Sequence, residues 1–147
     1  GSSGSTALSN AVNYAWGKGV VIVAAAGNSG NTRAQYPAYY TNCIAVVAVD
    51  GADKRASFSS FGSWTDISAP GVGILSTTGG DYESWNGTSM ATPHVAGLAA
   101  LAISAKSLQG KGVDVVRKAL TESATPLKDV PVEQQGAGLV DAAKLVK

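Results

Sequence analysis

Apolar residues recur at helical spacing from Ala7 to Trp16, and they predict a helix that Ser5 or Thr6 caps. Two continuous apolar segments follow, Val20–Ala26 and Ile44–Val49. Their β-branched residues predict strands that are buried on both faces of a sheet. Because a helix leads directly into the first of these strands, this order of elements favours a parallel sheet.

The second half of the chain is expected to alternate short strands with helices. Strands are expected at 66–69 and 74–77, helices at 89–106, 113–122 and 139–146, and turns or loops between them. The helix at 89–106 is apolar on nearly every face, which is typical of a central, buried helix. We therefore expect an α/β fold with three layers, in which helices cover both faces of a mostly parallel sheet.

Composition and charge narrow the functional classes. The chain has 147 residues, a length that suits one domain over 1–147. Its formal net charge of +1 predicts neither a nucleic-acid partner nor binding to an anionic membrane. No apolar run is long enough to span a bilayer. The chain opens with Gly1–Ser5 and not with a basic and then apolar segment, so no signal peptide is expected. One cysteine and one histidine exclude an internal disulfide and a histidine cluster.

The most informative segment is Asn86–Gly97, with the sequence NGTSMATPHVAG. It places Ser89 where a glycine-containing loop meets the start of the long apolar helix. Free N–H groups and the positive end of the helix dipole stabilise negative charge there. A nucleophilic serine needs such a place, because its attack on a carbonyl produces an oxyanion. For Gly-Thr-Ser alone, an N-cap role of Thr88 or Ser89 is the simpler interpretation.

A second segment of interest, Val20–Asn28, ends in Ala-Ala-Ala-Gly-Asn. A side-chain amide directly after a buried strand can donate a hydrogen bond into a cleft at the sheet edge. Taken alone, Asn28 is more simply explained as an ordinary turn residue.

Together the two segments resemble the subtilisin-like serine proteases, the subtilase family, in its subtilisin–thermitase branch. Tyr36–Ala38, Arg55–Gly62 and Ala69–Gly71 resemble the same family in the same order, so the resemblance covers nearly the whole chain. It implies a subtilisin-like fold, and a secreted, extracellular endopeptidase that acts on polypeptides through an acyl-enzyme. It also implies that the Tyr36–Pro37 bond is cis.

The resemblance further implies a role for individual residues. Ser89 is the expected nucleophile, and Asn28 with the Ser89 N–H is expected to hold the oxyanion. The substrate-side-chain pocket would be lined by Ala25, Ala26 and Gly27. Calcium or sodium could bind to the carbonyl groups of Ala38, Tyr40 and Cys43 with the carboxylate of Asp66. An ordinary solvated loop is an equally good interpretation of those four residues, and no organic cofactor is expected.

The histidine and the aspartate of a Ser-His-Asp triad are missing from the family's usual motifs. Five helical positions separate His94 from Ser89, which places the two side chains about 140° apart around the helix. We therefore expect His94 to be a packed, structural histidine. The chain resembles the C-terminal portion of a subtilase, inactive by itself, whose partner is the N-terminal portion of the same protease. The alternative is a non-catalytic fragment that binds peptides or another subunit.

Overall fold

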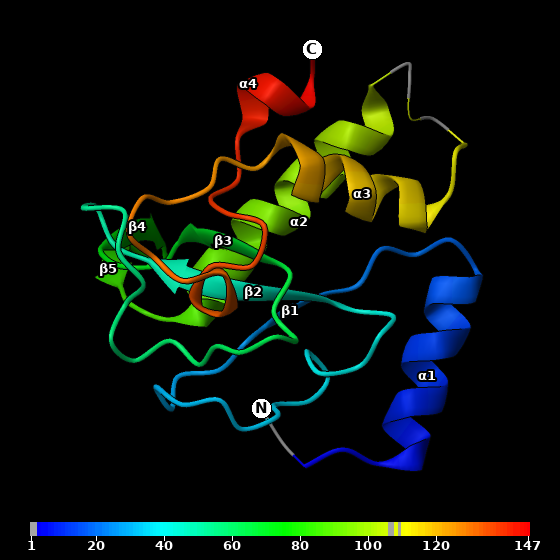
Figure 1. Cartoon of the computed structure of the whole chain (residues 1–147), viewed down its shortest axis with the longest axis horizontal. Helices are drawn as coiled ribbons and strands as arrows, with labels where there is room; N and C mark the ends of the chain where they lie inside the picture. Colours follow the sequence, from blue (N-terminus) through cyan, green and yellow to red (C-terminus); the bar gives the residue numbers. More distant parts are fainter. Residues whose placement is uncertain (1–2, 106–107, 109) are drawn as a thin grey trace.

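The computed structural model describes residues 3–105, 108 and 110–147 (Figure 1). Its centre is a parallel sheet of three strands in the order β1-β2-β3. The strands are β1 (Val23–Ala25), β2 (Ile44–Val49) and β3 (Ile67–Pro70), and an antiparallel hairpin adds β4 (Ile74–Thr77) and β5 (Tyr82–Trp85). The helices are α1 (Thr6–Gly17), α2 (Thr88–Ser104), α3 (Val113–Ser123), the short 3₁₀-helix η1 (Val132–Gln134) and α4 (Ala142–Leu145). This arrangement confirms the predicted α/β class.

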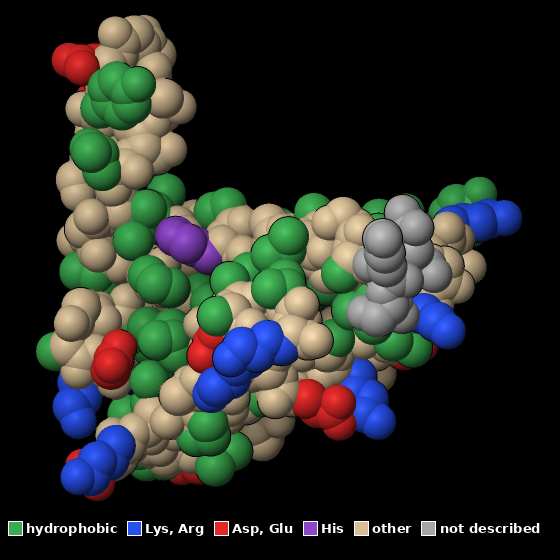
Figure 2. All heavy atoms as spheres, turned by 90° about the horizontal axis from the view of Figure 1, so that it is seen from above, with side chains coloured by type: hydrophobic (Ala, Val, Ile, Leu, Met, Phe, Trp, Pro, Cys, Tyr) green, Lys and Arg blue, Asp and Glu red, His purple; other side chains and the backbone are tan. Residues whose placement is uncertain are grey.

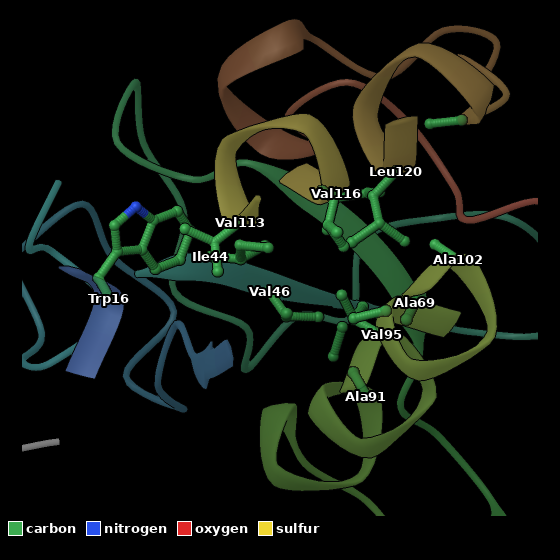
Figure 3. Close-up of a cluster of buried hydrophobic side chains, with 14 of the residues drawn as sticks. Trp16, Ile44, Val46, Ala69, Ala91, Val95, Ala102, Val113, Val116 and Leu120 are labelled. Atoms are coloured by element: carbon green, nitrogen blue, oxygen red, sulfur yellow. The ribbon is translucent and has the colours of Figure 1, made fainter. Parts of the chain in front are cut away.

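Strand β2 forms the middle of the core, and all six of its residues are buried. Helix α2 packs across the three strands of the sheet, and α3 packs against α2 on the same side. Figure 3 shows the side chains that fill this layer, with Ile44 and Val46 of the sheet facing Val95 of α2 and Val116 of α3. A continuous run of β-branched residues forms such a strand because neither of its faces meets water.

The start of α1 follows its sequence signal, because the hydroxyl oxygen of Ser5 accepts a hydrogen bond from the Leu8 N–H at 3.1 Å. At the other end of α1, Trp16 reaches the core beside Ile44 and is only 6 % exposed. The opposite face of the sheet is covered by a smaller apolar cluster around Ala45 and Cys43. The Tyr36–Pro37 bond is cis, as expected.

The structure differs from the sequence-based expectations in two strands. The segment Val20–Ala26 contributes only the three residues of β1 to the sheet. Residues 79–87 contain β5, which pairs with β4 and is exposed along its whole length. No burial pattern marks β5, because both faces of the hairpin meet solvent. The predicted strand at 74–77 is confirmed, and the strand expected at 66–69 is displaced by one residue.

Helix α2 is not buried on every face, contrary to the expectation. Its buried residues form one stripe, whereas Leu101 and Ile103 are each 41 % exposed. The described residues cover the sides of α2 that face the sheet and α3, and they leave its outer face exposed. The end expected at Lys106 lies outside the described residues. No described helix combines the length and the apolar character that crossing a membrane requires.

The carboxyl ends of the strands bring together the segments that contain Asn28, Gly71 and Ser89. Because β1, β2 and β3 are parallel, their carboxyl ends lie at one edge of the sheet. Asn28 follows β1 at this edge, and Gly71 follows β3. The N-terminus of α2, with Ser89, meets both segments through hydrogen bonds described below. In open α/β sheets this edge is the usual place for a ligand.

Candidate active site

Ser89 is the second residue of α2 and is exposed. The first four N–H groups of a helix have no partner within the helix. In α2, the first of them bonds to Asn28, and the third and fourth share the Gly87 carbonyl at 3.0 and 3.3 Å. The second, the Ser89 N–H, makes no hydrogen bond to any residue that the structure describes. It is therefore free to bind an oxygen atom brought by a ligand.

Asn28 is held by the residue that precedes the serine. Its Oδ1 atom accepts from the Thr88 N–H at 2.9 Å and from the Thr88 hydroxyl at 2.8 Å. The same hydroxyl oxygen accepts from the Gly27 N–H at 3.1 Å, and Thr88 is fully buried. Because these bonds use the oxygen end of the carboxamide, they leave its Nδ2 donor to point elsewhere. The sequence offered no sign of this role for Thr88 beyond its being a candidate N-cap.

The two donors lie near the same point in space. An ideal Cβ atom built on Gly87 would be 3.6 Å from Asn28 Nδ2 and 3.7 Å from the Ser89 nitrogen. The two residues also line one hollow of about 500 Å³, which we call the oxyanion hollow. It is lined by Asn28, Ser84, Trp85, Asn86, Gly87, Ser89 and Met90. The arrangement can hold a negatively charged oxygen beside the Ser89 hydroxyl.

His94 is exposed, which contradicts its expected packing as a structural histidine. Figure 2 shows the imidazole at the surface, bordered by hydrophobic side chains. It edges a second hollow of about 360 Å³ together with Ser89. Its Nδ1 atom lies 2.9 Å from the Met90 carbonyl oxygen, so Nδ1 carries the proton and donates it. No hydrogen bond joins His94 to the Ser89 hydroxyl, and its exposure follows from the uncovered outer face of α2.

Comparison with known proteins identifies the family. The model of the subtilase family, peptidase S8, matches residues 1–138. The chain belongs to the subtilase family. Thermitase from Thermoactinomyces vulgaris is 47 % identical in an alignment of 148 positions, which covers all of this chain and 51 % of thermitase. Subtilisin DY from Bacillus licheniformis is 49 % identical over 97 % of this chain and 53 % of its own length.

Two solved protease structures have the same fold. A protease from Pseudoalteromonas arctica superimposes with a TM-score of 0.90 at 34 % sequence identity, covering 98 % of this chain and 47 % of that protein. The prenylagaramide maturation protease PagA gives a TM-score of 0.86 at 33 % identity. The chain therefore has the subtilisin-like fold and spans about half the length of the relatives that it matches.

The expected substrate-pocket residues lie beside the subtilase site, but they do not line the two hollows that Ser89 edges. Ala25 ends β1 and is half-buried, and Ala26 is fully buried. Gly27 is buried and has a φ of 102°, and a Cβ there would lie 2.9 Å from Gln35 Cγ. The three residues form a closely packed surface next to Asn28, and their contact with substrate stays a prediction.

The residues expected to bind calcium or sodium do not fit a cation as they stand. Ala38 and Tyr40 precede Cys43 in the loop before β2, where the Cys43 carbonyl accepts a hydrogen bond from Arg117. The carboxylate of Asp66 lies 3.9 Å from the Nε atom of the same guanidinium. A positive guanidinium thus donates to one of the four groups and lies beside a second, and its charge opposes a metal ion at this place. The described residues contain no cluster of three or more His, Cys, Asp or Glu suited to a metal.

Asp66 and Arg117 instead join the sheet to α3. Burial raises the pKa of the Asp66 carboxyl, and the Ala45 N–H, which donates to it at 2.7 Å, and Arg117 oppose that rise. The Arg117 guanidinium also stacks 4.7 Å from the centre of the Trp16 ring. This group is therefore explained by packing between α1, β2, β3 and α3.

We expect the Cys43 thiol to be unreactive in the folded protein. Its side chain is 1 % exposed, and burial, followed by the nearby charge of Asp66, raises the pKa of the thiol to about 12. Almost no thiolate exists at neutral pH under these conditions. With the thiol reagent DTNB, colour should develop only as fast as the protein unfolds, and a sample in guanidinium chloride serves as the control. Rapid reaction of the native protein would contradict the placement of Cys43.

Proposed function

We propose that this chain carries the nucleophile and the oxyanion site of a secreted serine endopeptidase. The observation that supports this most directly is a pair of donors, the Ser89 N–H and Asn28 Nδ2, that make no hydrogen bond to any described residue. They lie beside an exposed hydroxyl at a helix N-terminus. Bacterial subtilisins and thermitase among the relatives support peptide-bond hydrolysis and export from the cell.

In the proposed reaction, a base removes the proton of the Ser89 hydroxyl as its oxygen attacks the scissile carbonyl. The carbonyl oxygen becomes an anion and receives hydrogen bonds from the Ser89 N–H and from Asn28 Nδ2. The protonated base then gives its proton to the leaving nitrogen, so that collapse of the intermediate releases the amine and leaves an acyl group on Ser89. Water hydrolyses this ester, which releases the carboxylic acid and restores the Ser89 hydroxyl. Thr88 fixes Asn28 before the reaction begins, so no rearrangement is needed as charge develops.

The base in this proposal comes from an amino-terminal half, because His94 is turned to the Met90 carbonyl. The chain spans only about half of its relatives, and the uncovered face of α2 is apolar. Next to this face lies a third, mostly apolar hollow of about 410 Å³. It is lined by Pro70, Pro93, His94, Gly97, Leu98, Leu139, Val140 and Ala142. Covering this surface would remove apolar area from water and bring a histidine to Ser89.

A complementation experiment tests this proposal. The chain is mixed or fused with an amino-terminal half that carries the missing histidine and aspartate, either the native one or the matching residues of thermitase. We call the product the complete protease. The chain alone should bind the dye ANS and leave a fluorogenic peptide intact, whereas the complete protease should cleave it. A cooperative melt of the isolated monomer without dye binding contradicts the need for a partner, and an inactive, folded assembly contradicts the enzymatic proposal.

The alternative is a non-catalytic module that binds peptides or another subunit. It is favoured by one observation: within the described ranges, no imidazole or carboxylate is hydrogen-bonded to the Ser89 hydroxyl. Such a module would use the same cleft but would have no base. Peptide binding without cleavage by the folded complete protease would support this alternative.

Removing the Thr88 hydroxyl should weaken catalysis while the nucleophile stays in place. In a Thr88→Val variant, the Gly27 N–H loses its buried acceptor and Asn28 loses one of its two restraints. The unsatisfied Gly27 N–H costs about 1–3 kcal/mol of stability. Because Asn28 is also held less firmly, we expect a loss of about tenfold in kcat, which corresponds to about 1.4 kcal/mol of activation free energy. The measurement is steady-state cleavage by the complete protease. Thr88→Ser keeps the hydroxyl and is the matched control, and equal activity of the two variants would exclude this role.

A further inference from the structure

Gly71, the first residue after β3, lies buried between the central strand β2 and the loop that leads into α2. Its N–H donates to the Val49 carbonyl at 2.9 Å, which joins it to the end of β2. Its carbonyl accepts from the Gly87 N–H at 2.8 Å, which joins it to the N-cap of α2. Gly71 is thus the direct link between the sheet and the residue that borders both oxyanion donors.

There is no room for a side chain at this link. A Cβ atom on Gly71 would lie 2.6 Å from the Cβ of Ala48 and 2.8 Å from the carbonyl oxygen of Gly87. Ordinary van der Waals contacts begin near 3.4 Å. Gly71 does not have a positive φ, so glycine is required here for space and not for its backbone conformation.

Only one of the two neighbours can move. Ala48 is fully buried in the middle of β2 and is paired with Ala69 of β3, so the sheet resists displacement. Gly87 belongs to a loop, and its carbonyl accepts the first hydrogen bonds of α2. A methyl group at 71 would therefore push Gly87, and with it the Ser89 N–H, away from Asn28.

We propose that Gly71 is a positioning residue that sets how closely the loop before Ser89 approaches β2. The absence of a side chain lets the loop before Ser89 approach β2 closely, and this approach brings the Ser89 N–H and Asn28 Nδ2 to the same point. The inference rests on the proposed function for its effect on catalysis. Its structural part, the attachment of Gly87 to β2 through Gly71, stands independently.

The test is a Gly71→Ala variant of the complete protease. We expect kcat to fall about 10- to 100-fold, because a displacement approaching 1 Å misplaces the oxyanion donors, while KM changes by less than about threefold. Gly79→Ala is the matched control, since Gly79 has no positive φ and a Cβ there meets nothing within 4 Å. The double variant Ala48→Gly/Gly71→Ala should regain part of kcat, because the new methyl group can then move toward β2.

Hydrogen exchange supplies a readout that does not depend on activity. In Gly71→Ala, the Gly87 amide, which donates to Gly71, should exchange at least about tenfold faster, and it should be unchanged in Gly79→Ala. Unchanged exchange of this amide in Gly71→Ala would overturn the inference, as would unchanged kcat in an active protease. If the complete protease without substitutions cleaves nothing, the proposed function is wrong. The exchange of the Gly87 amide then still tests whether Gly71 attaches Gly87 to β2.

Discussion

Replacing Ser89 with alanine is expected to lower kcat of the complete protease by about 10⁶-fold, the size of loss known for the nucleophile of a subtilisin. Ser89 is exposed at the N-terminus of α2 and borders both hollows of the site. Without its hydroxyl, no acyl-enzyme can form, and only the binding groups and the oxyanion donors remain. The measurement is cleavage of a fluorogenic peptide at saturating substrate.

The matched control for this variant is Ser63→Ala, because Ser63 is an exposed serine outside the oxyanion hollow. It should leave kcat and the melting temperature unchanged. Melting curves of Ser89→Ala show whether the lost activity has a structural cause. A folded Ser89→Ala protein that retains more than a hundredth of the activity would contradict the role of Ser89 as nucleophile.

The second large effect is expected for Asn28→Asp, which separates the two functions of the Asn28 carboxamide. The aspartate keeps an oxygen that can accept from Thr88, but it replaces the Nδ2 donor by a second, negatively charged oxygen. Loss of one oxyanion donor costs about 10²–10³-fold in kcat, a range established on a subtilisin asparagine, and the added negative charge opposes the oxyanion further. We expect a loss of at least this size with little change in KM.

Asn10→Asp provides the control for the added charge, since Asn10 is exposed on α1. This variant should behave like the unaltered protease. If Asn28→Asp keeps its activity while Asn28→Ala loses it, Asn28 acts only by holding Thr88, and the proposed oxyanion role is wrong. Parallel losses in both variants support the donor role.

The sequence predicts well those strands and helices whose burial shows as a regular pattern of apolar residues within the element itself. Ile44–Val49 reads as a strand buried on both faces because all six residues are apolar, and β2 has these bounds. Helix α3 was predicted from its amphipathic period and extends only one residue further. In both cases burial imposes a regular pattern that is visible along the chain.

Features that depend on distant parts of the chain were not predictable in this way. His94 lies in an apolar helix and was expected to be packed, but the described residues leave that face of α2 uncovered. The bonds from Thr88 to Gly27 and Asn28 span about sixty positions in the sequence, and no local pattern announces them. The narrow space at Gly71 is likewise set by Ala48 and Gly87, which belong to other elements.

Ser89 and Asn28 were identified through the resemblance to subtilases, because neither residue has a decisive local pattern of its own. The structure adds the geometric reason why they can cooperate. Asn28 follows β1, Ser89 begins α2, and the carboxyl edge of the parallel sheet brings these two segments together. Their roles in catalysis remain predictions that the variants above can test.

The central claim, that Ser89 is an activated nucleophile, is tested most directly by mapping the adduct of a fluorophosphonate probe by mass spectrometry. In the complete protease, the phosphonyl group should be found on Ser89 in nearly every molecule, and the isolated chain should react far more slowly. An active complete protease that carries the adduct on another residue would contradict the account. So would a folded complete protease in which Ser89 stays unmodified.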